Sequence, residues 1–281
     1  MPPESKEPEI LMIDSENLLC DFEDLVRLPN TIYISVDWSI EFYLAQAYQG
    51  MIATAIRDKY LLPELQSSYC TLDWLDLRVG KGFRKSLKNA TSNGWKFEIK
   101  LAESLEAVLE GIKTAHGESS WLSLKYAAIL KELFGRRDFK YRGAKFRLVA
   151  VELRASQSDQ KPVLVAGEVG YVFGTVYTSL TGFTKRSKNS EFPKSVSLGT
   201  LQLLALSKIL ACSNFQFWNL GHPPRGALMR YKAELGGRVV SREEFLVRWR
   251  AGRSAIRETS LDYPWEQLLV GQGRDATLGL I

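Results

Sequence analysis

The sequence is poor in the side chains that bind transition metals. It has three cysteines and two histidines in 281 residues. Cys20, Cys70 and Cys212 lie far apart and form no C-x-x-C pair, and only His116 and His222 are present to complement them. A structural zinc site takes four such ligands, so the composition argues against a metal centre.

Long apolar runs are also missing. No run approaches the ~18–20 residues that a membrane-spanning helix needs. The first ten residues, MPPESKEPEI, are acidic and proline-rich, and they lack the basic and apolar regions of a secretion signal. We therefore expect a cytoplasmic protein without a membrane partner, with residues 1–9 as a disordered tail.

Several catalytic motifs are absent. There is no G-x-S-x-G elbow of a serine hydrolase. The stretch GKGFRKS at 80–86 has glycines and a lysine but not the spacing of a phosphate-binding P-loop. The turn SVSLGTLQ at 195–202 has one glycine and no arginine, which argues against an acetyl-CoA loop. A small-molecule acetyltransferase therefore remains a weak alternative.

Positive charge is in slight excess and is concentrated in one segment. The chain has 37 basic and 32 acidic residues, which permits an anionic partner without requiring one. At 100° per residue, five cations of segment 77–88 fall within about 120° of one another, opposite Val79, Phe83 and Leu87. These cations are Arg78, Lys81, Arg84, Lys85 and Lys88. The pattern predicts an amphipathic helix whose basic face is either a solvated surface or a contact for nucleic-acid phosphates.

The chain divides into a small first unit and a larger second one. Segment 31–36, TIYISV, predicts a strand, and Asp37 or Ser39 is placed to cap a helix that Gly50 ends. Turn residues from Pro63 to Ser68 mark a boundary. We predict a small α/β N-terminal domain at 10–73 and a second domain at 74–281.

For the second domain the sequence predicts helices, then strands, then a strand–helix–strand unit. Apolar spacing predicts helices at 105–112 and 123–134, and β-branched runs predict strands at 145–154 and, as one long strand, at 163–183. A helix at 195–214 leads directly into the strand 215–220, which suggests parallel pairing. Ser241 and Glu244 form a capping box for a closing helix. The fold class is therefore α/β (α+β) with a mixed sheet.

Taken in order, these segments resemble the leucyl/phenylalanyl-tRNA–protein transferase family over about 230 residues. The matching stretches are LPNTIYISVDWS and LAQAYQGMI near the start, the basic LRVGKGFRKSLK, GESSWLSLKYAAILKELF, AGEVGYVFGTVYTSLTGFTKR, and LGGRVVSREEFLVRWRAGR near the end. No one motif is very specific, and the order and spacing carry the resemblance.

The resemblance implies an acetyltransferase-like (GNAT) C-terminal domain that works without acetyl-CoA, any other cofactor or a metal. The family transfers an aminoacyl group from the 3′ end of a charged tRNA to the α-amine of a protein N-terminus, which directs the product to N-degron proteolysis. The implied partners are thus an aminoacyl-tRNA and an acceptor protein N-terminus. The amino acid transferred, the acceptor and the oligomeric state stay open.

On this template, Trp121 takes the place of an aromatic residue in the pocket for the amino-acid side chain, and Tyr177 and Trp218 lie beside it on strands. Read without the template, Trp121 is a core aromatic at a helix start. The five cations of segment 77–88 become the contact with the tRNA acceptor stem.

The sequence departs from the family at the catalytic centre. Asn219-Leu220-Gly221 stands where the family has D-C-Q, and Ser179-Leu180-Thr181-Gly182-Phe183 stands where it has G-E-S-M-F. Asn219 can orient an amine but cannot act as a general base. Ser179 and Thr181 become candidate substrate contacts.

Glu168 is the nearest replacement for the missing carboxylates, unless it is a surface strand residue. Two hypotheses follow. The first is a transferase of hydrophobic aminoacyl groups with altered acceptor choice, and the second is a non-catalytic relative that binds tRNA or protein N-termini.

Overall fold

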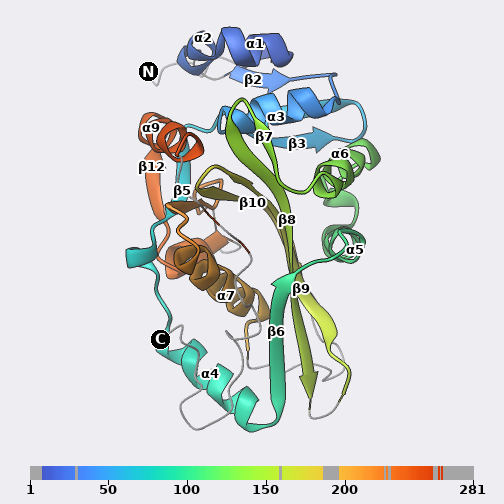
Figure 1. Cartoon of the computed structure of the whole chain (residues 1–281), viewed down its shortest axis with the longest axis vertical. Helices are drawn as coiled ribbons and strands as arrows, with labels where there is room; N and C mark the ends of the chain where they lie inside the picture. The colour runs from blue at the N-terminus through green and yellow to red at the C-terminus, as the bar shows by residue number, and fades with distance from the viewer. Residues whose placement is uncertain are drawn as a thin grey trace, which may run out of the picture.

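The computed structural model describes residues 8–28, 31–157, 160–185, 196–224, 226, 229–255, 259 and 261. Its centre is a large mixed sheet (Figure 1). In spatial order the sheet contains β12 (Arg238–Ser241), β5 (Ser68–Leu72), β11 (Phe217–Asn219), β10 (Val176–Thr184), β9 (Val163–Phe173), β8 (Ala144–Gln157) and β6 (Trp95–Leu101), with β7 (Phe139–Tyr141) paired to β8. The predicted mixed α/β class is confirmed.

Helices cover both faces of this sheet (Figure 1). One hydrophobic core holds residues of α3 (Ile40–Tyr48), α5 (Glu106–His116), α6 (Leu124–Gly135) and α9 (Arg242–Arg253). The other core holds residues of α4 (Lys81–Ser92) and α7 (Leu198–Cys212). Both predicted N-caps are present, because the Ser39 and Ser241 hydroxyls accept the Phe42 and Glu244 amides, but only this half of the predicted Ser241–Glu244 capping box is formed.

The strands β10 and β11 run parallel and are joined through α7. They pair at only three positions, from Val176↔Phe217 to Thr178↔Asn219, whereas β10 continues along β9 as far as Thr184. Beyond Thr178 the two strands therefore separate. Antiparallel strands followed by a helix and a diverging parallel strand are the arrangement expected of a GNAT domain, so this part of the fold prediction is also confirmed.

The long strand predicted at 163–183 is wrong in one respect, because it is two strands. Gly174 has φ +56°, a left-handed value that glycine adopts without strain, and the chain reverses there. β9 and β10 then pair antiparallel from Val176↔Phe173. The turn was missed because valine and threonine, typical strand residues, directly follow the single glycine.

The N-terminal segment adds two small sheets beside this core. β1 (Glu9–Met12) pairs parallel with β2 (Thr31–Ile34), and β3 (Ile52–Ile56) pairs antiparallel with β4 (Tyr60–Glu64). Glu9, the last residue of the predicted tail, is thus in a strand, and residues 1–7 lie outside the described part. The boundary after residue 73 stays a prediction, although β5 just before it pairs with β11 and β12.

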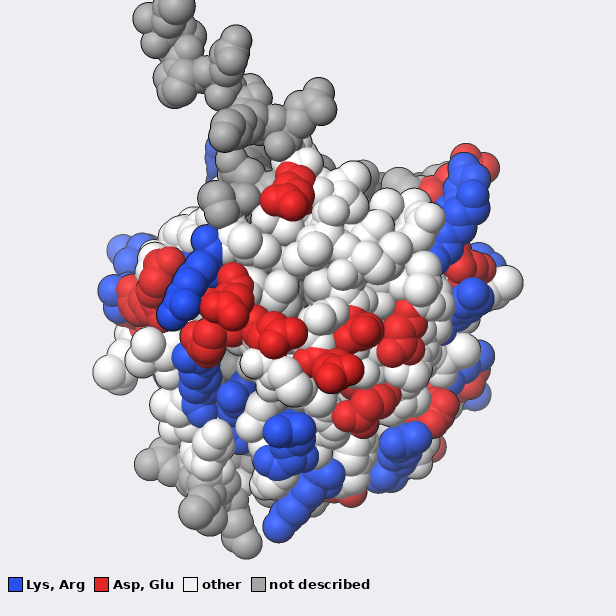
Figure 2. Space-filling model, turned by 90° about the horizontal axis from the view of Figure 1, so that it is seen from above, with Lys and Arg blue, Asp and Glu red and all other residues white. Residues whose placement is uncertain are grey.

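Acidic side chains gather at the end of the molecule that carries α1 (Ser15–Cys20) and α2 (Phe22–Arg27) (Figure 2). Residues 8–28 have a single cation, Arg27. Their acidic residues are Glu9, Asp14, Glu16, Asp21, Glu23 and Asp24. The net positive charge of the chain is therefore carried elsewhere.

The basic helix forms, but it begins later than predicted. α4 starts at Lys81, while Arg78 lies in the preceding extended segment and its amide donates to the Leu235 carbonyl at 2.9 Å. Gly80 and Gly82 disfavour an earlier start. Lys81, Lys85 and Lys88 are exposed, and Arg84 is half-buried. Leu87 and Ala90 hold the opposite face of α4 against the core.

Candidate active site

A large open cleft lies where β10 leaves β11. Its volume is about 2210 Å³, above the roughly 300–1,000 Å³ of a typical small-molecule pocket. Its walls come from the outer half of β10, the first turns of α7, α5 and the loop after β11. A large substrate, or two substrates bound together, therefore fits this cleft better than a single small molecule.

Three carboxylates line this cleft, and Glu168 is the buried one, since Glu64 is half-buried and Glu110 is exposed. Glu168 lies on β9, is 4% exposed and borders the cavity. The Tyr177 and Ser179 hydroxyls both donate to its Oε1, at 2.9 and 2.7 Å. Its Oε2 has no partner among the described residues and is not sealed from solvent, so it is open to the cleft.

The environment of Glu168 suits it to proton transfer. Burial raises the pKa of its carboxyl to about 7, against the opposing effect of the bonds from Ser179 and Tyr177. A general base is most effective when its pKa is near the working pH. The site therefore offers a proton acceptor for a nucleophile that enters beside Oε2.

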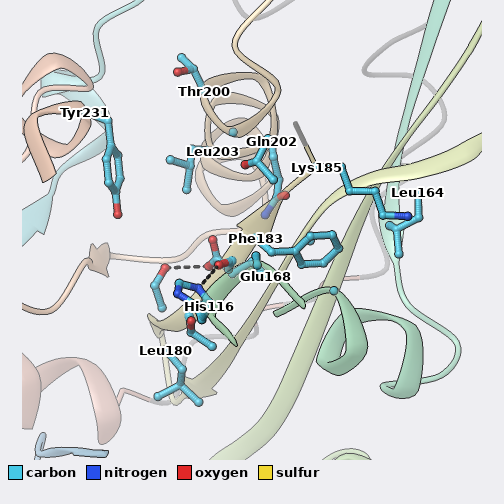
Figure 3. Close-up of a pocket in the computed structure, with 18 of the residues that line it drawn as sticks. His116, Leu164, Glu168, Leu180, Phe183, Lys185, Thr200, Gln202, Leu203 and Tyr231 are labelled. Carbon is cyan, nitrogen blue, oxygen red and sulfur yellow. Dashed lines mark hydrogen bonds between the residues drawn. The ribbon is translucent and has the colours of Figure 1, made fainter. Parts of the chain in front are cut away.

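Strand register gathers these groups on one face of the sheet. Glu168 is opposite Gly182, Ser179 is opposite Gly170, and Tyr177 is opposite Val172. Side chains alternate along a strand, so all three point to the face that α7 covers. Figure 3 shows Glu168 facing the turns of α7 that carry Thr200, Gln202 and Leu203.

Tyr177 and Trp218 form the floor of the site rather than its walls. Both are fully buried, and their rings pack edge to face with centroids 5.7 Å apart. Trp218 donates its indole N–H to the Ser179 Oγ at 2.8 Å, and Ser179 in turn donates to Glu168. The two aromatic residues therefore orient the carboxylate from below, without lining the cleft.

Gly170 makes room for this arrangement. A Cβ atom at residue 170 would lie 2.4 Å from the Tyr177 Oη and 2.5 Å from the Thr178 carbonyl oxygen. We expect Gly170→Ala to lower the free energy of unfolding by about 1–3 kcal/mol, as overpacking does. Urea denaturation measures this.

Gly135→Ala is the matched control, because a Cβ there meets nothing within 4 Å and residue 135 ends α6. We expect its stability to be unchanged or slightly higher. Equal stabilities for the two variants would show that the Tyr177 hydroxyl is not held against residue 170.

Trp121 borders the cleft, and its role in a pocket for the amino-acid side chain stays a prediction. It is half-buried and packs edge to face on Tyr126 at 4.7 Å. Leu180, Leu203 and Leu164 add apolar surface to the same cleft. Thr181 also lines it, next to an irregularity in β10 where the register shifts between Ser179 and Thr181.

Asn219 is fully buried and does not border the cleft. Its Oδ1 accepts the Gly221 amide at 3.0 Å, and its Nδ2 donates to the Thr178 Oγ1 at 3.4 Å. Gly221 follows with φ +72°. The carboxamide therefore holds the turn at the strand end, and this arrangement does not support the catalytic role predicted for Asn219.

Several polar residues of the cleft carry no sequence signal. The His116 Nε2 lies 3.0 Å from the Gly182 carbonyl oxygen, and the His222 Nε2 lies 2.6 Å from the Glu64 Oε2. Lys232 and Tyr231 come from the short helix α8 (Arg230–Glu234). These side chains come from β4, α5, the loop after β11 and α8, which only the folded chain brings together.

The predicted nucleic-acid contacts Arg78, Lys81, Arg84, Lys85 and Lys88 do not line the cleft. They lie on or just before α4, and α4 leads into β6, whose first residue Trp95 does line it. Figure 1 shows α4 at the end of the molecule where β6 begins. Their role stays a prediction.

Two kinds of feature are missing from the described part of the chain, a cluster of metal ligands and a membrane-spanning helix. No group of three or more His, Cys, Asp or Glu side chains gathers there as a metal site would require. No helix there is both long enough and apolar enough to cross a lipid bilayer.

Comparison with known proteins gives structural likenesses only. No family model matches the sequence, and no curated protein matches it. The fold is similar to the C-terminal domain of a putative lysylphosphatidylglycerol synthetase from Agrobacterium fabrum, at 14% identity over 82% of this chain and 74% of that one, with a TM-score of 0.42. It is also similar to FemX, at 9% identity over 84% and 80% with a TM-score of 0.42, and to L-PGS from Bacillus licheniformis, at 12% identity over 86% and 80% with a TM-score of 0.35.

Proposed function

We propose that this protein transfers an aminoacyl group from a charged tRNA to the α-amine of a protein N-terminus. The observation that carries the proposal is the Glu168 carboxyl, whose pKa burial raises to about 7 and whose Oε2 opens on a large cleft. The ordered resemblance of the sequence to leucyl/phenylalanyl-tRNA–protein transferases supplies the identity of the two substrates. Delivery of the product to N-degron proteolysis belongs to the same proposal.

The reaction needs a base but no further source of energy, because an aminoacyl ester is already activated. The amine attacks the ester carbonyl, the new C–N bond forms, and the C–O bond to the tRNA 3′ end breaks. Glu168 accepts the proton that the amine loses and returns it to the departing ribose hydroxyl. A free α-amine has a pKa of about 7.7–8.0, so a carboxylate with pKa about 7 is matched to this transfer.

The side chain of the transferred amino acid is expected to lie against Trp121. Trp121, Leu180 and Leu203 all border the cleft, with Trp121 and Leu180 packed against one hydrophobic core and Leu203 against the other. An apolar wall discriminates by about 1–3 kcal/mol for each methylene, which favours leucine-like and phenylalanine-like groups. The exposed cations of α4 are then available for tRNA phosphates, in a sequence-independent and salt-dependent contact.

Incubating the purified protein with labelled leucyl-, phenylalanyl- and alanyl-tRNA and a panel of N-terminal peptides tests the proposal. We expect labelled peptide from the first two tRNAs. Trp121→Ala is expected to lower kcat/KM for leucyl transfer about 10- to 100-fold, because the side chain loses an apolar contact.

Leu124→Ala is the control for this substitution, since Leu124 is 80% exposed and lies outside the cleft three residues away. If Trp121→Ala leaves kcat/KM for leucyl transfer unchanged, Trp121 does not form the pocket for the amino-acid side chain. Tight tRNA binding with no transfer across the whole panel would instead support the non-catalytic relative.

A further inference from the structure

Lys232 is a buried ammonium group at the cleft with no acidic partner. It lies on α8, is 5% exposed and lines the cavity. Its Nζ donates to the Leu220 and His222 carbonyl oxygens, each at 2.7 Å. None of the ion pairs formed between described residues includes Lys232.

One donor of this ammonium has no hydrogen-bond partner among the described residues. A lysine carries three N–H groups, and the two carbonyl bonds occupy two of them. Carbonyl oxygens solvate the charge in part but do not neutralise it, and buried charges in proteins are as a rule paired. Burial accordingly lowers the pKa of Lys232, against the opposing effect of the neighbouring Cys70 thiol. The described residues therefore provide no carboxylate partner for this ammonium group.

The position of Lys232 is one where ligands bind. The carbonyls that hold it follow directly after β11, at the carboxyl end of the parallel pair β10–β11. Ligands of open α/β sheets sit outside the carboxyl ends of such strands. Tyr231, the residue before Lys232, stands across the pocket from Glu168 (Figure 3).

We propose that Lys232 binds a phosphodiester group of the substrate at this end of the cleft. The inference rests on the proposed function, in which the group beside the reacting ester is the last phosphodiester of the tRNA 3′ end. The attacking α-amine brings no negative charge to the reacting centre, so the tRNA is the source of the anion. Lys232 then holds the terminal nucleotide of the tRNA in place, while Glu168 accepts the proton that the amine loses.

Two short substrates separate this role from others. Leucyl-adenosine has no phosphate, whereas leucyl-cytidylyl-(3′→5′)-adenosine has one phosphodiester. We expect Lys232→Met to raise KM for the dinucleotide ester about 10- to 100-fold, because a hydrogen bond between charged groups is lost. KM for leucyl-adenosine, which has no phosphate, should change by less than about threefold. Lys131→Met, an exposed lysine outside the cleft, is the control.

An equal loss with both substrates would overturn the proposal, because Lys232 would then only hold the loop or stabilise the reaction intermediate. No loss with either would overturn it as well. Melting followed by circular dichroism shows whether the variant folds.

A measurement on the unmodified protein needs no variant. Acetylation of individual lysines by a limiting reagent is followed by mass spectrometry, with cytidylyl-(3′→5′)-adenosine or adenosine present. We expect the dinucleotide, and not adenosine, to slow acetylation of Lys232 at least threefold, while Lys131 reacts equally in both. Equal protection by the two ligands, or none, would contradict phosphate binding.

This second measurement also separates the two proposals. Protection of Lys232 by the dinucleotide in a protein that transfers nothing would keep the phosphate site and overturn the transferase. Active transfer by a protein whose Lys232 is not protected by the dinucleotide would keep the transferase and overturn the phosphate site.

Discussion

Replacing Glu168 by glutamine is expected to lower kcat for aminoacyl transfer by about 10²- to 10⁴-fold, the usual contribution of a positioned base. Glutamine has the same shape, and its carboxamide oxygen still accepts the Tyr177 and Ser179 hydroxyls that Glu168 accepts. It has no basic site for the proton of the amine. The loss should therefore appear in kcat, with KM for the charged tRNA changed little.

The pH profile provides the second readout of this substitution. The carboxylate form is the active one and the pKa of Glu168 is about 7, so the wild-type profile of kcat should contain an acid limb at about pH 7. Glu168→Gln should lack this limb and keep only the one at about 7.7–8.0 that the α-amine gives to both proteins.

Glu152→Gln is the matched control, because Glu152 is equally buried at 4% exposure, lies on the neighbouring strand β8 and does not itself line the cleft, although its partner Arg154 does. We expect it to keep both kcat and the acid limb. If Glu168→Gln retains the wild-type rate, another group accepts the proton and the proposed mechanism is wrong.

Local patterns in the sequence were sufficient for most of the fold. The helix caps at Ser39 and Ser241 depend on neighbouring residues only, and so does the amphipathic pattern of α4. The parallel pairing of β10 and β11 follows from a helix that directly joins two strands. Such features need no knowledge of distant contacts.

The side to which a strand residue points was harder to predict. Tyr177 and Trp218 are on strands, as expected, but their rings face the core beneath Glu168. Direction depends on register, which here is set by the turn at Gly174 and the irregularity after Ser179. The sequence pattern shows neither of these, since both lie within a continuous stretch rich in residues typical of strands.

Contacts between distant segments were beyond local patterns altogether. Glu168 was identified only as a carboxylate near the expected centre. Its burial depends on the folded chain, and that burial raises its pKa against the opposing effect of the bonds from Ser179 and Tyr177. Lys232 looks like an ordinary lysine on a short amphipathic helix. Its partners, the Leu220 and His222 carbonyls, are 12 and 10 residues away in the sequence.

The same Glu168→Gln substitution is expected to stabilise the protein at alkaline pH. An unperturbed glutamate, as in the unfolded chain, has a pKa of 4.5, and burial raises the pKa of Glu168 to about 7 in the folded chain. The folded state therefore binds this proton more tightly, which stabilises it fully below about pH 4 and is lost as the pH rises through 7. The difference of about 2.5 pKa units corresponds to about 3 kcal/mol.

Denaturation by urea at pH 4.5 and pH 8.5 measures the effect. At pH 8.5 the wild-type protein holds a buried carboxylate, and Glu168→Gln should be more stable by about 3 kcal/mol; at pH 4.5 the carboxyl is protonated and the two proteins should differ by less than about 1 kcal/mol. Glu152→Gln should show no such gain at pH 8.5, because Arg154 compensates that charge at 2.8 Å. A gain of equal size at both pH values would mean that packing and not ionisation separates the variants. A gain confined to alkaline pH, together with lost transfer, would show that a carboxylate costly to the fold is retained at residue 168 because the reaction needs a base there.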